Sequence, residues 1–343
     1  MGSFKDDQLK LGVIGGGSWG TSLANLAGRK GHAVDLWVYE LEVIKQIRSH
    51  HENRTFLPGV TLSANLNATN NIERAVYQKD LVLVVVPSHV MRMTTAQFSD
   101  HLLPDTILVS ASKGIENDTH LTMTGVMGET LPFLSLDRTG VLSGPSFARE
   151  VSREVPTAVT VASKNQDTAE LIQRALATPF FRIYTIDDVM GVELGGAVKN
   201  VIAIAAGAID GLGLGQNTRA ALITRGQTEI RRLGLRMGAQ PRTFTGLAGI
   251  GDLVLTCTGD QSRNHTVGER IGKGEKLADI LADMQMVAEG VKTARSVYNL
   301  SRKLGVEMPI CHTVFHVLYD NMPPREGLFT LMTRDLKYEL DAV

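Results

Sequence analysis

Two patterns of hydrophobic positions divide this chain of 343 residues. In the first half, short apolar runs alternate with segments whose apolar residues recur at helical spacing. The runs predict strands at residues 11–14, 34–38, 80–86, 106–110, 140–143, 158–162 and 182–185. The segments between them predict helices at residues 21–29, 89–101, 118–131 and 167–177. This alternation predicts an α/β domain, residues 1–189, built on a doubly wound, largely parallel sheet.

From about residue 190 onward, the strand pattern gives way to long helical periodicities. They predict helices at residues 192–209, 217–233, 266–272, 277–284, 293–304 and 313–319. Asn217 has the side chain of an N-cap, and Gly234 is suited to the position just after a helix end. The sequence therefore predicts a second, all-helical domain over residues 190–343.

The stretch that includes the first predicted helix of that domain, residues 189–209, is almost apolar enough for a membrane span. Glu193, Lys199 and Asn200 interrupt it, and a lysine at the centre of a bilayer costs about 2.5–3.5 kcal/mol. We therefore expect a buried helix of a globular domain and no integral membrane segment.

A glycine motif follows the first predicted strand. Gly15, Gly17 and Gly20 have G-x-G-x-x-G spacing, and a helix follows them. In a dinucleotide-binding turn, the first glycine permits the tight turn, the second admits a pyrophosphate and the third lets the helix pack closely. The free N–H groups at the helix N-terminus favour the phosphates. Glu40, at the end of the next strand, is near the usual place for an acid that binds a ribose. We interpret this as a Rossmann-like domain; the alternative is a glycine-rich turn used only for packing.

Composition excludes several other classes of function. The formal net charge is −1, so no bulk field attracts nucleic acid or an anionic membrane. The two cysteines, Cys257 and Cys311, form no disulfide framework or metal-binding spacing, and the histidines indicate no metal site. The first residues carry no apolar signal segment. A cytoplasmic protein without a bound metal is the expectation.

Two lysines are candidates for chemistry. Lys113 follows a predicted strand, where a doubly wound sheet binds its ligands; alternatively it is a solvated loop lysine. Lys199 lies in a helix that is apolar on nearly all sides, so it must pair, lose its proton or face a cavity. We expect the neighbouring Gly195 and Gly196 to let a ligand approach closely. The alternative is a lysine that extends out of the helix end to water.

Further candidates occur later in the chain. Asp252 ends a glycine-rich run and could hold a lysine or a substrate hydroxyl, or only cap a helix. Residues 261–265, Gln-Ser-Arg-Asn-His, precede a predicted helix and suit an oxyanion such as phosphate; alternatively they form a solvated turn. From periodicity alone, Glu289 is interpreted as a surface acid.

Several motifs in order resemble one family over residues 10–335. They are Gly-Gly-Gly-Ser-Trp-Gly-Thr (15–21), Ser-Lys-Gly-Ile-Glu (112–116), Ser-Gly-Pro-Ser-Phe-Ala (143–148), Gly-Ala-Val-Lys-Asn-Val-Ile-Ala-Ile (196–204), Gly-Leu-Gly-Leu-Gly-Gln-Asn-Thr-Arg-Ala-Ala (211–221), Thr-Arg-Gly (224–226), Gly-Leu-Ala-Gly-Ile-Gly-Asp-Leu (246–253) and Ser-Arg-Asn (262–264). The chain is similar in these motifs to the bacterial-type NAD(P)-dependent glycerol-3-phosphate dehydrogenases.

The resemblance implies reversible reduction of dihydroxyacetone phosphate to sn-glycerol 3-phosphate with NAD or NADP, for glycerophospholipid synthesis, by a cytoplasmic homodimer. It implies a helical domain like the C-terminal domain of 6-phosphogluconate dehydrogenase. Lys199 matches the catalytic lysine, assisted by Lys113 and Asp252. The matched cofactor contacts are Gly15, Gly17, Ser18, Trp19, Gly20, Tyr39, Lys113, Ala148, Arg263, Val287 and Glu289. The matched substrate contacts are Lys113, Gly144, Ser146, Lys199, Asp252, Ser262, Arg263 and Asn264. Trp19 replaces a Phe or Tyr that is common there, but it is also a flat ring.

Two alternatives remain open on the sequence alone. One is a β-hydroxyacid dehydrogenase of the 6-phosphogluconate type, which also carries a lysine on the first helix of a helical domain. The other is a non-catalytic dinucleotide sensor, which would need neither Lys113 nor Lys199. The preference between NAD and NADP is also open, because Glu40 would repel a 2′-phosphate while Arg29, Lys30 and Lys45 are close in sequence.

Overall fold

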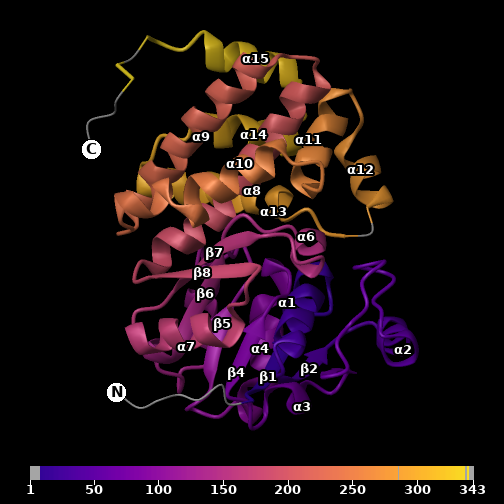
Figure 1. Cartoon of the computed structure of the whole chain (residues 1–343). Helices are drawn as coiled ribbons and strands as arrows, with labels where there is room; N and C mark the ends of the chain where they lie inside the picture. The colour runs from indigo at the N-terminus through magenta and orange to yellow at the C-terminus, as the bar shows by residue number, and fades with distance from the viewer. Residues whose placement is uncertain (1–7, 285, 337, 340–343) are drawn as a thin grey trace.

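The computed structural model describes residues 8–284, 286–336 and 338–339. Figure 1 shows an α/β domain, drawn in indigo and magenta, below a helical domain drawn in orange and yellow. The chain start, predicted to carry no signal segment, and the last four residues of the predicted helical domain lie outside the described residues.

The α/β domain is built on one sheet of eight strands, in the order β3-β2-β1-β4-β5-β6-β7-β8. The strands are β1 (Lys10–Ile14), β2 (Ala33–Trp37), β3 (Leu66–Thr69), β4 (Leu81–Val84), β5 (Ile107–Ser110), β6 (Thr139–Ser143), β7 (Thr157–Ala162) and β8 (Phe181–Ile186). Every neighbouring pair is parallel except β6 and β7. The predicted largely parallel sheet is confirmed. The short strand β3, Leu-Asn-Ala-Thr, was missed because four residues with two polar members give a weak apolar run.

Helices cover both faces of this sheet, and a separate apolar cluster lies on each face. They are α1 (Ser18–Arg29), α2 (Leu41–His50), α3 (Ile72–Val76), α4 (Met91–Phe98), α5 (Met123–Thr130), α6 (Ala148–Ser152) and α7 (Gln166–Leu176). The helix predicted over residues 118–131 begins only at Met123. Residues Ile115 and Thr122 form a β-bridge, which holds the intervening segment as a loop.

The second domain is helical throughout its described part. Its helices are α8 (Val189–Gly211), α9 (Gln216–Arg236), α10 (Asp252–Thr258), α11 (Arg263–Gly272), α12 (Leu277–Asp283), α13 (Glu289–Leu304), α14 (Pro309–Tyr319) and α15 (Pro324–Met332). The central helix α8 is long and apolar enough to cross a membrane, yet 89% of its apolar window is buried inside the molecule. This burial confirms the prediction of a core helix, because its neighbours α9, α10, α11 and α13 pack against it.

The capping prediction for α9 is wrong at both ends. The N-cap is Gly215 rather than Asn217, and the helix continues past Gly234 to Arg236. Gly234 has a packing role instead, because a methyl group there would lie 2.1 Å from the ring of Phe244. A glycine that fits a local cap signal can thus be required by a distant aromatic ring.

The close packing of α8 and α11 positions the candidate phosphate-binding turn. A methyl group on Gly207 would lie 1.9 Å from the carbonyl oxygen of His265, and one on Gly268 would lie 1.9 Å from that of Ile204. Glycines on both helices therefore let the two backbones touch. The first turn of α11 is consequently fixed against α8, the helix that carries Lys199.

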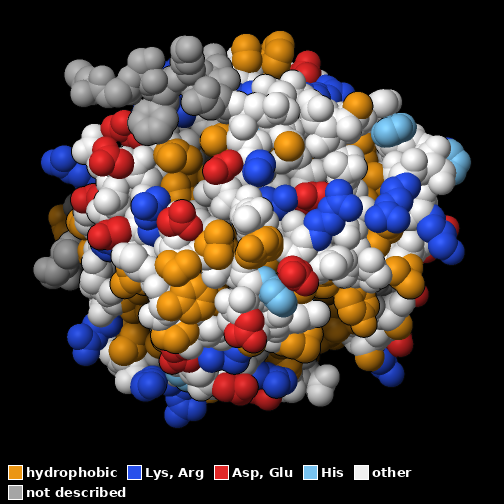
Figure 2. All heavy atoms as spheres, turned by 90° about the horizontal axis from the view of Figure 1, so that it is seen from below, with side chains coloured by type: hydrophobic (Ala, Val, Ile, Leu, Met, Phe, Trp, Pro, Cys, Tyr) orange, Lys and Arg blue, Asp and Glu red, His pale blue; other side chains and the backbone are white. Residues whose placement is uncertain are grey.

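The outer face of the α/β domain is mixed in charge. Figure 2, which views the molecule from below, shows Lys and Arg interspersed with Asp and Glu among small apolar areas. This face shows no extended surface of a single sign, in keeping with the net charge of −1.

Candidate active site at the domain junction

The glycine turn lies where the strand order reverses, after β1 and beside β4, which is the ligand-binding point of a doubly wound sheet. Gly15 has φ +123°, which side chains disfavour, and a methyl group on Gly20 would lie 1.9 Å from the Gly15 carbonyl oxygen. Gly17 is the N-cap of α1. Among the described residues, nothing beyond its neighbours in the chain lies within 4 Å of the position that a methyl group on Gly17 would occupy. The turn is therefore closely packed on its inner side and open where a pyrophosphate would approach the first-turn N–H groups of α1.

Aromatic and small residues surround this turn. Ser18 and Trp19 form the first turn of α1, and the Trp19 ring lies 6.5 Å from that of Phe181. Tyr39, just after β2, is 79% exposed and contacts Trp37 edge-on. Ala148 begins α6, and its carbonyl oxygen accepts a hydrogen bond from the Ser22 hydroxyl of α1 at 3.1 Å. Ser18 and Trp19 thus begin the helix that follows the glycine turn, and Ala148 is hydrogen-bonded to the same helix.

Three charged residues meet at the junction of the domains. The Lys113 ammonium, from the loop after β5, donates to Asp252 Oδ2 at 2.6 Å. Lys199, from the middle of α8, donates to Asp252 Oδ1 and, at 2.7 Å, to Thr256 Oγ1. Asp252 and Lys199 are buried, whereas the Lys113 side chain is 20% exposed. A carboxylate held between two ammonium groups leaves one net positive charge at the site.

This arrangement shifts the pKa of both buried groups. Burial lowers the pKa of Lys199 to about 7, with the Lys113 charge acting in the same direction and Asp252 opposing it. Burial favours a raised pKa for Asp252, but the charges of Lys113 and Lys199 outweigh it and hold that pKa below its ordinary value. A lysine whose pKa is near 7 can both give and accept a proton at neutral pH, which is what a general acid–base group requires.

The glycines near Lys199 have a different use from the one expected. A methyl group on Gly196 would lie 2.8 Å from Ser143 Oγ and 3.6 Å from the stem of Lys113. Gly196 therefore lets the strand-end loops and the Lys113 side chain approach α8, and through this approach Lys113 reaches Asp252. The alternative of a Lys199 that extends to solvent is wrong, because its side chain is 7% exposed.

Thr256 is a site residue that sequence reasoning missed. It follows Asp252 by four residues on α10, so both side chains lie on one face of that helix. Its hydroxyl also donates to the Asp252 carbonyl oxygen at 2.6 Å. The spacing Asp-x-x-x-Thr was visible in the sequence. Such an i, i+4 pair does not indicate a site by itself, because only the contact with Lys199 shows that both side chains face the same group.

The residues predicted for phosphate begin a helix rather than precede one. Ser262 is the N-cap of α11 and accepts a hydrogen bond from the His265 N–H, and Arg263 and Asn264 form the first turn. Asn264 Oδ1 accepts from the Gly290 N–H at 2.9 Å, which connects this turn to α13. His265 bonds Asp210 of α8 at 2.7 Å. The exposed Arg263 side chain has no hydrogen-bond or ion-pair partner among the residues that the structure describes.

The last matched residues lie around the same junction. Glu289, interpreted as a surface acid, is instead partly buried at the start of α13 and accepts a 2.6 Å hydrogen bond from the Ser88 hydroxyl. Periodicity failed here because α13 begins at residue 289 rather than 293, so Glu289 lies against the other domain. Val287 is 39% exposed. Gly144 is buried after β6, and its carbonyl oxygen accepts from the Ser146 hydroxyl at 3.1 Å.

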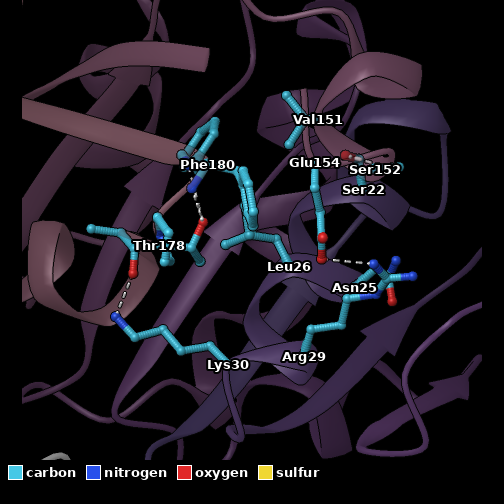
Figure 3. Close-up of a pocket in the computed structure, with 13 residues that line it drawn as sticks. Ser22, Asn25, Leu26, Arg29, Lys30, Val151, Ser152, Glu154, Thr178 and Phe180 are labelled. Carbon is cyan, nitrogen blue, oxygen red and sulfur yellow. Dashed lines mark hydrogen bonds and ion pairs between the residues drawn. The ribbon is translucent and has the colours of Figure 1, made fainter. Parts of the chain in front are cut away.

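A separate hollow of about 280 Å³ lies away from these groups. Figure 3 shows it between α1, α6 and the segment before β8, with Leu26, Val151 and Phe180 on its walls and the Arg29–Glu154 ion pair at one side. Neither the two lysines of the charged cluster nor its carboxylate line this hollow. Within the described ranges, no group of three His, Cys, Asp or Glu side chains is placed to hold a metal ion.

Together, a glycine turn at the switch point of a doubly wound sheet and a buried lysine on an adjoining helical domain define an NAD(P)-dependent oxidoreductase. Residues 10–169 match the N-terminal domain, and residues 188–328 the C-terminal domain, of the NAD-dependent glycerol-3-phosphate dehydrogenases. The chain belongs to this family.

Individual relatives agree with this assignment. The chain is 58% identical over 330 residues to glycerol-3-phosphate dehydrogenase (NAD(P)+) of Geobacter sulfurreducens, covering 96% of this chain and 98% of that protein. It is 56% identical to the protein of the same name from Syntrophobacter fumaroxidans, over 96% and 97% of the two chains. The crystal structure of glycerol-3-phosphate dehydrogenase from Coxiella burnetii superposes with a TM-score of 0.91 at 36% identity, covering 95% and 99%.

Proposed function

We propose that this protein reversibly reduces dihydroxyacetone phosphate to sn-glycerol 3-phosphate with NADH or NADPH. Family membership and full-length relatives of that name support the reaction. The observation that carries the proposal within the chain is the Lys113–Asp252–Lys199 cluster, which provides a titratable ammonium beside a second positive charge. Retention of both lysines argues against a non-catalytic sensor, and the family match argues against an enzyme of the 6-phosphogluconate type.

In this proposal each residue has a distinct role. A reduced nicotinamide cofactor, held at the glycine turn, would supply the hydride that the ketone carbon of the substrate accepts. The Lys199 ammonium gives its proton to the ketone oxygen as negative charge develops there, and solvent returns a proton to Lys199 afterwards. Asp252 orients both ammonium groups, and Lys113 polarises the same oxygen. In the direction of oxidation, neutral Lys199 accepts the hydroxyl proton.

The phosphate of the substrate would bind at the first turn of α11. Arg263 has a guanidinium without a partner in the described residues, and free helix N–H groups lie beside it. Binding energy from the phosphate positions the reacting carbon near Lys199. Ser262 and Asn264 define the shape of this turn. Gly144 and Ser146, from the loop after β6, are further substrate contacts in this proposal.

The deciding experiment is an initial-rate assay with purified protein, dihydroxyacetone phosphate and NADH. We expect substrate-dependent loss of NADH and formation of sn-glycerol 3-phosphate. Absence of activity, with activity on 6-phosphogluconate or another β-hydroxyacid instead, would replace the proposed reaction.

For the cofactor we propose that both NADH and NADPH are used, with NADH somewhat preferred. Glu40 is exposed at the N-cap of α2, where it would repel a 2′-phosphate. A kcat/KM tenfold in favour of NADPH would overturn this preference. We further propose that the protein is a cytoplasmic homodimer whose product supplies glycerophospholipid synthesis. Sedimentation at assay concentration tests the dimer, and a single-chain mass would contradict it.

A further inference from the structure

Ser88 is an interdomain residue that no part of the proposed reaction uses. It lies at the carboxyl end of β4, in the short helical turn Ser88–Val90, and is 4% exposed. Its hydroxyl crosses the domain junction and donates to Glu289 Oε2 of α13 at 2.6 Å. This is a hydrogen bond from a neutral donor to an acidic side chain, a kind that is stronger than average.

Ser88 also supports the loop that carries Lys113. Gly114, the next residue, has φ +157°, and a methyl group there would lie 2.5 Å from both Cβ and Oγ of Ser88. The same methyl position is 3.7 Å from the hydroxyl of Thr293, one turn after Glu289 on α13. Ser88 is thus packed between the Lys113 loop and the start of α13.

The surroundings of Glu289 make this contact significant for a bound ligand. Burial raises the pKa of Glu289, while hydrogen bonds from Ser88 and the charges of Arg263 and Lys292 act in the opposite direction. His89, the residue after Ser88, has its pKa lowered by burial and by the charge of Lys292. Without the Ser88 hydroxyl, Glu289 loses its side-chain partner and keeps only the hydrogen bond from the Ser88 backbone N–H, so its carboxylate is directed less firmly.

We propose that Ser88 is a positioning residue for the reaction: its hydroxyl fixes the direction of Glu289 at the cofactor side, and its packing beneath Gly114 sets the Lys113 loop against the helical domain. This inference rests on the proposed function in one respect, namely that Glu289 contacts the nicotinamide cofactor. A purely structural role is the competing explanation, since any contact between domains could stabilise the junction.

The molecule offers a matched control for that competing explanation. Ser296, two turns further along α13, is fully buried and donates to the Ile115 carbonyl oxygen at 2.8 Å and to Asn117 Oδ1 at 2.9 Å. It therefore also joins α13 to the loop after β5 through a serine hydroxyl, but it does not contact Glu289. Ser88→Ala and Ser296→Ala remove the same group from the same junction.

The experiment measures KM for NADH and kcat, at saturating dihydroxyacetone phosphate, for wild type, Ser88→Ala, Glu289→Ala, the double variant and Ser296→Ala. We expect Ser88→Ala to raise the KM for NADH about tenfold, the loss of one hydrogen bond to a charged group. We expect kcat to stay within threefold and Ser296→Ala to change KM less than twofold. Ser88→Cys, which keeps a weak donor at the same position, should give an intermediate KM.

The double variant decides between coupling and coincidence. If Ser88 acts through Glu289, the double variant has the KM of Glu289→Ala alone. Effects that multiply, or an equal rise in KM for Ser88→Ala and Ser296→Ala, would overturn the inference. A Glu289→Ala enzyme with unchanged KM for NADH would also overturn it while leaving the proposed reaction intact. An inactive wild type would instead refute the proposed reaction itself. Direct titration of NADH fluorescence gives the same comparison for a variant with low turnover.

Discussion

The α/β domain and the helical domain present their ligand-binding groups in opposite ways. In the turn that contains Gly15, Gly17 and Gly20, the ligand-binding groups are uncharged backbone N–H donors of the first turn of α1, and the turn is open at Gly17. In the helical domain the groups are buried charges, with Lys199 and Asp252 53 residues apart in sequence and Lys113 contributed by the other domain. One half of the site is thus a local backbone shape, and the other is a network of mutually dependent side chains.

This difference determines how each half tolerates change. The shape of a backbone turn depends on few neighbours. A substitution there therefore acts through the volume of the added side chain, which either clashes with the backbone or occupies the space of the ligand. A buried ion network leaves a charge without its partner whenever one member is removed, so its members act as a unit and their effects do not add. The predictions below test this contrast.

The largest effect is expected from Lys199→Ala. Loss of the proton donor should lower kcat by about 10²- to 10⁴-fold. Binding of NADH should stay within about threefold of wild type, because the glycine turn is in the other domain. Stopped-flow turnover and NADH fluorescence titration measure the two quantities, and Lys199→Met, which fills the space, controls for a cavity. Turnover within threefold of wild type would mean that another group gives the proton.

Arg263→Ala should be next. Charge-assisted hydrogen bonds are worth roughly 1.5–3 kcal/mol each, so kcat/KM for dihydroxyacetone phosphate should fall at least about tenfold. Arg263→Lys should retain activity only in part, because an ammonium group lacks the planar, bidentate geometry of a guanidinium. Unphosphorylated dihydroxyacetone is the matched control: wild type should use it poorly, and the substitution should hurt it much less. An equal loss on both substrates would place the phosphate site elsewhere.

The pH dependence should reflect the buried network. Burial lowers the pKa of Lys199 to about 7, and the reduction needs the protonated amine. Initial kcat/KM for reduction should therefore fall above about pH 7, by up to about tenfold per pH unit, while oxidation should rise over the same range. Measurements above pH 6.5 avoid the phosphate titration near pH 6. Equal rates of reduction from pH 6.5 to 9 would contradict the role of Lys199.

Two glycine substitutions test the other half of the comparison. A methyl group on Gly20 would lie 1.9 Å from the Gly15 carbonyl oxygen, so Gly20→Ala should destabilise the fold by about 1–3 kcal/mol, as overpacking does. Gly17→Ala has open space and an extended backbone, so its melting temperature should match wild type while its KM for NADH rises several-fold. Differential scanning fluorimetry and initial rates separate the two, and equal melting temperatures would refute the packing argument for Gly20.

The last prediction concerns a buried acid outside the site. Glu229 of α9 accepts hydrogen bonds from the N–H groups of Ile310 and Cys311, yet burial raises its pKa from 4.5 to about 7. Because the folded-state pKa is the higher one, its stabilising contribution is complete below about pH 4.5 and lost as pH rises through about 7.

The wild-type melting temperature should therefore fall relative to that of Glu229→Gln between pH 5 and 8. The slope is at most about 1.4 kcal/mol per pH unit. The exposed Glu42→Gln, on α2, serves as control and should not alter the pH dependence. A constant difference between wild type and Glu229→Gln would show that the backbone donors hold Glu229 ionised.

The sequence by itself determined the local and periodic features. Alternating apolar runs set the doubly wound sheet, and the glycine spacing set the turn after β1, because both depend on residues that are neighbours in the chain. The motif order, with the Rossmann-like and helical halves, was enough to identify the family. Each of these features can be recognised in the sequence without knowing which segments pack against it.

Only the tertiary structure decided which charges meet. Lys113, Lys199 and Asp252 converge because Gly196 lets a strand-end loop lie on α8, and no local pattern records that contact. Glu289 faces Ser88 rather than water for the same reason, and Thr256 gains its meaning from Lys199. Side-chain ionisation follows burial and distance to other charges, and both are set by segments far apart in sequence. A chain can thus specify its elements residue by residue, while the chemistry of its buried groups exists only once the two domains are packed together.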